Sequence, residues 1–235
     1  MRMFFQVGEV VVSRVFTAMM KAMSMKFKSM EEAFFVSVSA QAANTPDCYK
    51  PFPNLRCIVD AFEIFIQKPQ NMEQQSCTFS TYKKRNTVKF LVASSVYGGV
   101  SMISDGIEGS ASDRNLLMKS GILSHLNSGE AVVADRGFDV EPELNEMGVD
   151  LIIPPFLGGR DAFTQRELML QRSVAAARSH VETVIGRIKN NRLMGETYPN
   201  TMLDILSDVV RWQPILSISV TLLSIGIKKK KSGWM

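Results

Sequence analysis

The chain has 235 residues, 46% hydrophobic and 21% charged, which is the balance of a globular protein that buries a core. The net charge of +4 permits a polyanionic partner without requiring one. Three cysteines without a CxxC pair and two isolated histidines argue against a disulfide framework, a zinc site and a histidine-based metal site.

The first fifty residues predict an N-terminal helical segment followed by a linker. Apolar residues recur at helical spacing over 8–36, and the predicted stripe, which is either core or interface, consists of Val11, Val15, Met19, Met20 and Met23. Residues 37–54 are rich in small residues and proline, as in a linker or an irregular crossing. We therefore treat residues 1–50 as one unit, ahead of a domain over 51–226 and a basic tail over 227–235.

From residue 55 onward the pattern predicts a mixed α/β domain. Strands are expected over 55–66, 87–97 and 99–108, with a hairpin through Gly98 and Gly99. A helix over 112–123 with Ser112 as its N-cap follows, then a strand from 131 and a short helix over 141–147. A strand over 149–155 and a long helix from about 164 to 192 complete the order. This order predicts a mixed five-stranded sheet flanked by helices.

The C-terminal region resembles a membrane anchor, but it is too short to be one. The apolar run over 214–227 is only fourteen residues long and is interrupted by three serines, against the roughly 20 apolar residues that a spanning helix needs. We expect a buried helix over 204–226 and no membrane association. Lys228 to Lys231 predict either a nuclear localisation patch, and hence a nuclear protein, or a solvated tail.

Two aspartates lie on strands that otherwise read as buried. Asp60 interrupts an apolar strand, and Asp135 ends the strand in "AVVADRGF" at residues 131–138. A buried carboxylate is costly unless something pairs with it, and neighbouring Arg136 points to the other face. If the two strands are neighbours, both carboxylates emerge at one edge of the sheet. A hard divalent cation such as Mg²⁺ would then relieve their repulsion.

A third acid, Glu182, lies in "RSHVETVIGRIKNNR" at residues 178–192. Helical periodicity places Glu182 just beside an apolar stripe, with Arg178 and Lys189 on the same side. The stripe that packs on the sheet consists of Val174, Ala177, Val181, Val184 and Ile188. An acid at the edge of the core, flanked by bases, suits a metal site over which phosphates arrive.

These residues carry a resemblance to a known family. The ordered segments "VDAFEIFIQKP" (59–69), "FSTYKKRNTVK" (79–89), "GSASD" (109–113), "DRGF" (135–138) and "RSHVETVIGRIK" (178–189) resemble the DDE superfamily endonucleases. The most similar branch is that of the PIF/Harbinger-like transposases and the nucleases derived from them. The resemblance covers roughly residues 51–211.

The resemblance implies an RNase H-like fold and metal-dependent cleavage of DNA. It also implies that Asp60, Asp135 and Glu182 are the catalytic residues and bind divalent metal, two Mg²⁺ or Mn²⁺ ions in a two-metal-ion mechanism. The basic residues then become candidates for DNA contacts: Lys83, Lys84, Arg85, Lys89, Arg178 and Lys189. For Lys83 to Lys89, a solvated hairpin turn is an equally good interpretation.

The resemblance weakens at the N-terminus. Members of the family usually carry a DNA-reading helix-turn-helix region there, and only residues 11–20 resemble its end. We therefore expect a domesticated or truncated nuclease, for which a separate DNA-binding protein could supply the target site; a homodimer is also open. The alternative is a non-cutting adaptor that binds DNA or protein, and an RNA substrate also stays open because the fold handles both polymers.

Overall fold

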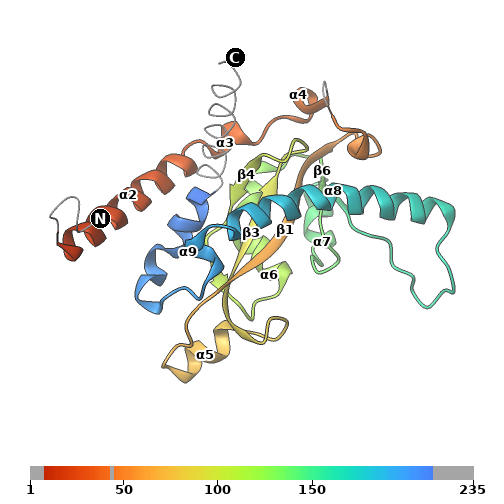
Figure 1. Cartoon of the computed structure of the whole chain (residues 1–235). Coiled ribbons are helices and arrows are strands. Elements are labelled where there is room, and N and C mark those ends of the chain that lie inside the picture. The colour runs from red at the N-terminus through yellow and green to blue at the C-terminus, as the bar shows by residue number, and fades with distance from the viewer. Residues whose placement is uncertain (1–7, 43–44, 214–235) are drawn as a thin grey trace, which may run out of the picture.

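The computed structural model describes residues 8–42 and 45–213 and confirms an α/β fold (Figure 1). The N-terminal segment is helical, as predicted. It contains α2 (Glu9–Lys28), α3 (Glu31–Phe34), α4 (Val38–Ala42) and the 3-10 helix η1 (Asp47–Tyr49). The region predicted as a linker is more than a connection, since Tyr49 and Phe52 are buried in the core of the domain. The N-terminal segment and the domain therefore share one core.

The sheet is mixed and has seven strands in the described residues, in the order β2-β3-β1-β6-β7, with β4 and β5 also paired to β3. Strand β1 is central, as its apolar character on both faces predicts: β3 pairs with it antiparallel and β6 pairs with it parallel. The strands are β1 (Leu55–Phe65), β2 (Phe79–Ser80), β3 (Arg85–Ser94), β4 (Val100–Ile103), β5 (Ile107–Glu108), β6 (Ala131–Val133) and β7 (Asp150–Ile152).

The two strands beyond the predicted five are short. The two-residue strand β2 was not predicted, and the strand expected over 99–108 is divided into β4 and β5. The division falls at Gly106, where the chain runs very close to β3. A Cβ atom at Gly106 would lie 2.5 Å from Cγ1 of Val88 and 2.8 Å from Cζ of Phe90. Only a residue without a side chain fits there, and this close approach is not visible in the sequence pattern.

We therefore expect Gly106→Ala to destabilise the protein by about 1–3 kcal/mol, because the added methyl group overpacks a rigid part of the sheet. Gly8→Ala is a suitable control, since a Cβ there meets no atom within 4 Å. Chemical denaturation should show a lower midpoint for Gly106→Ala and little change for the control. Equal midpoints would mean that β3 and β5 separate easily.

Helices cover both faces of the sheet (Figure 1). The long helix α8 (Gln165–Lys189) crosses one face of the sheet over β1, β3 and β6. On this face its apolar side chains form a hydrophobic cluster with Ile58, Phe62 and Phe90. On the other face, α6 (Asp113–Lys119) and α7 (Glu141–Glu146) pack on Val59 and Leu91. The connections contain η2 (Ile122–His125), and α5 (Met72–Thr78) follows β1.

The predicted stripe of the N-terminal helix is wrong in part. Met20 is buried and Met23 packs on the core, but Val11, Val15 and Met19 are exposed in the described part of the chain. The buried face of α2 instead adds Phe16 and Phe27. The helix is apolar on more than one side, so its sequence periodicity does not reveal which side meets the domain.

After α8 the chain continues through α9 (Arg192–Gly195) and η3 (Asn200–Ile205), and residues 206–213 are helical. Arg211 is buried and anchors this end: its guanidinium donates to Oγ of Ser24 at 2.5 Å and pairs with Asp105 at 2.5 Å. The rest of the helix predicted over 204–226 and the basic residues Lys228 to Lys231 lie outside the described residues. Among the described helices, none has the length and apolar character to cross a membrane.

Candidate active site

The register of two parallel strands places Asp60 and Asp135 on the same face of the sheet. Ile58 of β1 pairs with Val133 of β6, and both side chains face α8. Each aspartate comes two residues after its paired position, and side chains two apart on extended chain share a face. Asp60 and Asp135 therefore stand at the same level beneath α8, as the sequence predicts for neighbouring strands.

Helix α8 supplies the third carboxylate. Thr164 caps the helix through a capping box with Glu167, which fixes where the helix begins. The predicted stripe is confirmed, since Val174, Ala177, Val181, Val184 and Ile188 are all buried. Because that stripe sets the rotation of the helix on the sheet, Glu182 projects from its edge, half exposed, toward the two aspartates.

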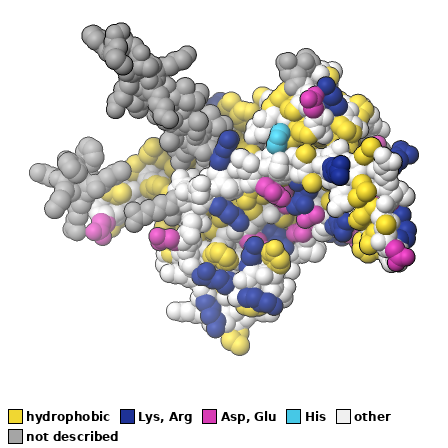
Figure 2. Space-filling view, turned by 45° about the vertical axis from the view of Figure 1, so that its right-hand side comes forward, with side chains coloured by type: hydrophobic (Ala, Val, Ile, Leu, Met, Phe, Trp, Pro, Cys, Tyr) yellow, Lys and Arg dark blue, Asp and Glu magenta, His cyan; other side chains and the backbone are white. Residues whose placement is uncertain are grey.

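The three acids line one cavity of about 500 Å³. Its charged lining comes from β1, the turn after β2, β3, α6, the end of β6 and α8. In the view of Figure 2, acidic side chains gather near the middle of the face, with lysine and arginine side chains around them. The acids of the lining are Asp60, Glu63, Asp113, Asp135 and Glu182, and the bases are Lys83, Lys89, Arg178 and Lys189.

Arg178 links the carboxylates. Its Nη2 lies 3.2 Å from Oδ2 of Asp135 and 3.6 Å from Oε1 of Glu182, one turn further along α8. This guanidinium is the partner that Asp135 requires, because Arg136 bonds instead to the carbonyls of Pro154 and Pro155. Nε of Arg178 is buried and has no hydrogen-bond partner, so the guanidinium is incompletely satisfied where it lies. Across residues 8–42 and 45–213, no three acidic, histidine or cysteine side chains form a ready metal-binding cluster.

Asp60 is the most strongly perturbed carboxyl of the cavity. Burial raises the pKa of Asp60, the negative charges of Asp135 and Glu182 add to the rise, and the resulting pKa is about 6 in place of 3.8. The backbone N–H of Ala61, which donates to Oδ1 at 2.8 Å, and the charge of Arg178 oppose this rise. The pKa nevertheless stays high because these two contacts do not replace the lost hydration. Asp60 thus lacks a full counter-charge.

Lys89 and Asp113 form a second pair in the cavity wall. Nζ of Lys89 lies 3.3 Å from Oδ1 of Asp113 and donates to the carbonyl of Ala111 at 2.6 Å, and the lysine side chain is only 13% exposed. Ser112 is the N-cap of α6, as predicted, so the side chain of Asp113 does not cap the helix. Gly137 packs against this pair: a Cβ there would lie 2.5 Å from Oδ2 of Asp113. The absence of a side chain at the glycine of "DRGF" therefore leaves room for the carboxylate of Asp113.

The other predicted basic residues divide into two groups. Lys83 and Lys189 line the carboxylate cavity, and burial together with the charge of Lys83 lowers the pKa of Lys189. Lys84 and Arg85 line a different cavity on the far side of the same turn. His180 is structural: its Nδ1 shares a hydrogen bond of 2.9 Å with the hydroxyl of Tyr49.

Sequence reasoning did not select Glu63 or Tyr82, two of the polar residues that line the cavity. Glu63 lies three residues after Asp60 and accepts a hydrogen bond of 2.7 Å from Thr87 on β3. Tyr82, in the turn before β3, is 81% exposed, and Nζ of Lys83 lies 4.4 Å from the centre of its ring. The sequence signal for Tyr82 was an aromatic residue among four bases, a pattern typical of nucleic-acid contacts.

The fold agrees with the comparison to known families. The chain belongs to the DDE superfamily endonucleases, whose family model matches residues 59–217. The mixed sheet flanked by helices is compatible with the RNase H-like fold of these enzymes. No curated protein and no solved structure gives a significant match to the chain. The family match indicates a transposase-like nuclease and does not specify the PIF/Harbinger-like branch.

Proposed function

We propose that this chain is a divalent-metal-dependent DNA endonuclease of the transposase type, with Asp60, Asp135 and Glu182 as its metal ligands. The observation that carries the proposal is the convergence of these three carboxylates, from two strands and one helix, on one cavity. The family membership supports the reaction class, phosphodiester cleavage in DNA.

The donor set fits a hard cation. Mg²⁺ and Mn²⁺ take carboxylate oxygens, and Mg²⁺ commonly uses only one or two of them together with water and phosphate oxygens. The incomplete charge compensation of Asp60 supports the same assignment, because a cation would favour its ionised form. When bound, two such ions would activate the attacking oxygen and stabilise the leaving oxygen in an in-line displacement at phosphorus.

The residues of the chain divide the remaining work. Asp60, Asp135 and Glu182 would hold the cation through their carboxylate oxygens. Arg178 neutralises Asp135 and Glu182 until a cation arrives, and its guanidinium is then free to bind a DNA phosphate. Lys83 and Lys189 would attract the backbone of the DNA at the rim of the cavity.

The test is the nicking of supercoiled plasmid by the purified full chain. We expect conversion to the open circle with Mg²⁺ or Mn²⁺ and none with EDTA. The triple variant Asp60→Asn, Asp135→Asn and Glu182→Gln, checked for folding by circular dichroism, is the control against a contaminating nuclease. Equal nicking by this variant would contradict the proposal.

One observation favours a second candidate, a non-cutting adaptor that binds DNA or protein. Arg178 already occupies the space between Asp135 and Glu182, and no ready metal-binding cluster exists among the described residues. An adaptor would bind DNA with EDTA present and would leave the plasmid intact with either metal.

The role of Arg178 gives a separate prediction. Arg178→Gln should tighten Mn²⁺ binding at pH 8 by at least about fivefold, because the guanidinium no longer competes for the carboxylates. The same variant should bind duplex DNA more weakly in EDTA, and the slope of log K against log salt should shrink by about 1. Isothermal titration calorimetry and fluorescence anisotropy measure the two effects.

Arg172→Gln is the matched control, since Arg172 is exposed on the same helix and does not line the cavity. If Arg178→Gln weakens Mn²⁺ binding instead, the arginine holds the carboxylates in position for the metal and does not compete with it.

Three finer proposals accompany the function. We propose a nuclear location, a partner protein that supplies target recognition, and membership of the PIF/Harbinger-like branch. The mechanism with two ions and the domesticated character of the nuclease are likewise proposals.

A further inference from the structure

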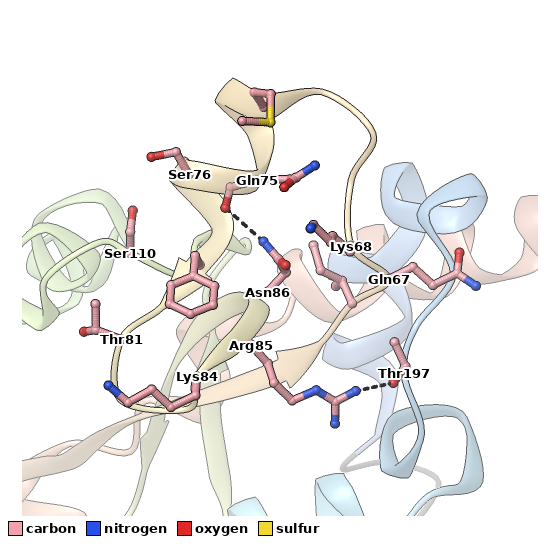
Figure 3. A pocket seen from close by; sticks show the side chains of 13 residues that line it. Gln67, Lys68, Gln75, Ser76, Thr81, Lys84, Arg85, Asn86, Ser110 and Thr197 are labelled. Atoms are coloured by element: carbon pink, nitrogen blue, oxygen red, sulfur yellow. Dashed lines mark hydrogen bonds between the residues drawn. The ribbon is translucent and has the colours of Figure 1, made fainter.

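A second cavity lies on the other side of the turn that precedes β3 (Figure 3). Its volume is about 860 Å³, within the range of about 300–1,000 Å³ that is typical of sites for small ligands. Helix α5, the end of β1, the start of β3 and the segment before Tyr198 form its walls. Nothing in the mechanism above uses this cavity.

The charged lining of this cavity is entirely cationic. Lys68, Lys84 and Arg85 line it, and no aspartate or glutamate does. Arg85 is fixed: its guanidinium donates to Oγ1 of Thr197 at 2.9 Å (Figure 3). The same guanidinium lies 4.5 Å from the centre of the Phe65 ring at the end of β1. Lys68 and Lys84 make no hydrogen bond or ion pair with the described residues. A concave site with uncompensated cations attracts an anion such as a phosphate.

The cavity also offers an apolar surface that a simple anion would not need. Phe79 and Met72 line it with 41% and 79% of their surfaces exposed. An aromatic face beside cations is the combination by which proteins bind single-stranded nucleic acid, since bases stack on the ring and phosphates meet the cations. A duplex presents its bases only at their edges and cannot stack them on a wall. The chemistry therefore fits unpaired nucleotides.

The position of the cavity connects it to the carboxylates. Within one turn, Thr81 and Lys84 line this cavity, whereas Tyr82 and Lys83 line the carboxylate cavity. Lys84 has a left-handed backbone with φ of 55°, which allows successive side chains to serve opposite sides of the turn. A DNA strand with a phosphate at the carboxylates would need to cross only this turn to reach the second cavity.

We propose that this second cavity binds unpaired nucleotides of the DNA strand that is cut at the carboxylates. The inference rests on the proposed function for its choice of strand. It predicts that the protein prefers DNA with a single-stranded end or an opened stretch next to the cleavage position.

The test compares the binding of a blunt duplex with that of the same duplex carrying a four-nucleotide tail of either polarity, by fluorescence anisotropy in EDTA. We expect the full chain to bind one tailed duplex about tenfold more tightly. Phe79→Leu keeps an apolar side chain but loses the ring, and should lose most of this preference. The double variant Lys68→Ala and Lys84→Asn should reduce the salt slope for the tailed duplex by about 1.4 and leave that for the blunt duplex unchanged.

The matched control is Lys26→Ala with Lys119→Ala, which removes the same charge from exposed positions outside both cavities. Asparagine at 84 tolerates the left-handed backbone, so the double variant should fold. Equal affinity of the full chain for blunt and tailed duplexes would overturn the proposal, as would equal losses on both duplexes for Phe79→Leu. Absence of plasmid nicking would instead contradict the proposed function, while a tail preference measured in EDTA would still establish the cavity.

Discussion

Glu182→Gln should lower the rate of plasmid nicking by on the order of a hundredfold or more at saturating Mg²⁺. The substitution keeps the shape of the side chain but removes a negative ligand, and a metal-bound phosphoryl transfer derives several kcal/mol of transition-state stabilisation from its ions. Folding should survive, because Glu182 is half exposed and the buried stripe of α8 is unchanged. Initial rates of open-circle formation, with circular dichroism on the same samples, measure both effects.

Glu146→Gln serves as the control, since Glu146 is exposed at the end of α7 and does not line the cavity. Nicking by Glu182→Gln at the wild-type rate under saturating Mg²⁺ would mean that the acid is only a surface charge paired with Arg178. The metal would then have to bind elsewhere in the cavity, and Asp113 and Glu63 would be the next carboxylates to test.

The second large effect concerns stability. Asp60→Asn should stabilise the metal-free protein at pH 8 by about 1–3 kcal/mol, because the wild-type carboxyl is ionised there in a site that raises its pKa from 3.8 to about 6. Between those two pH values the folded state retains a proton that the unfolded state has released. Wild-type stability therefore falls as the pH rises from about 4 to about 6, and the loss is complete above the higher value.

Thermal denaturation in EDTA tests this expectation. For a chain of this length the advantage of Asp60→Asn at pH 8 should amount to several degrees in the midpoint, and it should be roughly half as large at pH 5. Asparagine retains an oxygen that can accept the hydrogen bond from Ala61. The exposed Asp150→Asn is the control. A lower midpoint for Asp60→Asn at pH 8 would show that the ionised carboxylate is stabilising in the folded protein, and the same variant should lose nicking activity in either case.

The local pattern of the sequence was sufficient for the elements that hold the site. The apolar character of β1 on both faces predicted a central strand, and the 3,4-spaced stripe predicted which side of α8 meets the sheet. Ordered segments along the chain predicted the family. The central strand and the buried side of α8 depend on the residue pattern within a single strand or helix, which a sequence displays directly.

The contacts between elements were decided only by the tertiary structure. Arg178 was expected to meet phosphate, and the fold pairs it with Asp135, which lies 43 residues earlier in the chain. Lys89 was expected on a phosphate track, and the fold turns it toward Asp113 on α6. The sequence shows which residues are charged but not which of them form ion pairs, because ion pairing between two elements depends on how the elements pack.

Helix α2 and the turn before β3 show the same limit. All sides of α2 carry apolar residues, so the choice of Met20 and Phe27 as its buried side follows from the surface of the domain and not from the helix. Lys83 and Lys84 are adjacent and chemically identical, yet they line different cavities on the two sides of a turn in which the backbone of Lys84 is left-handed. By itself the sequence determined which residues carry charge and which faces are apolar. Only the tertiary structure decided which of those charges share a cavity, since that depends on the register of β1 with β6 and on the path of α8 across them.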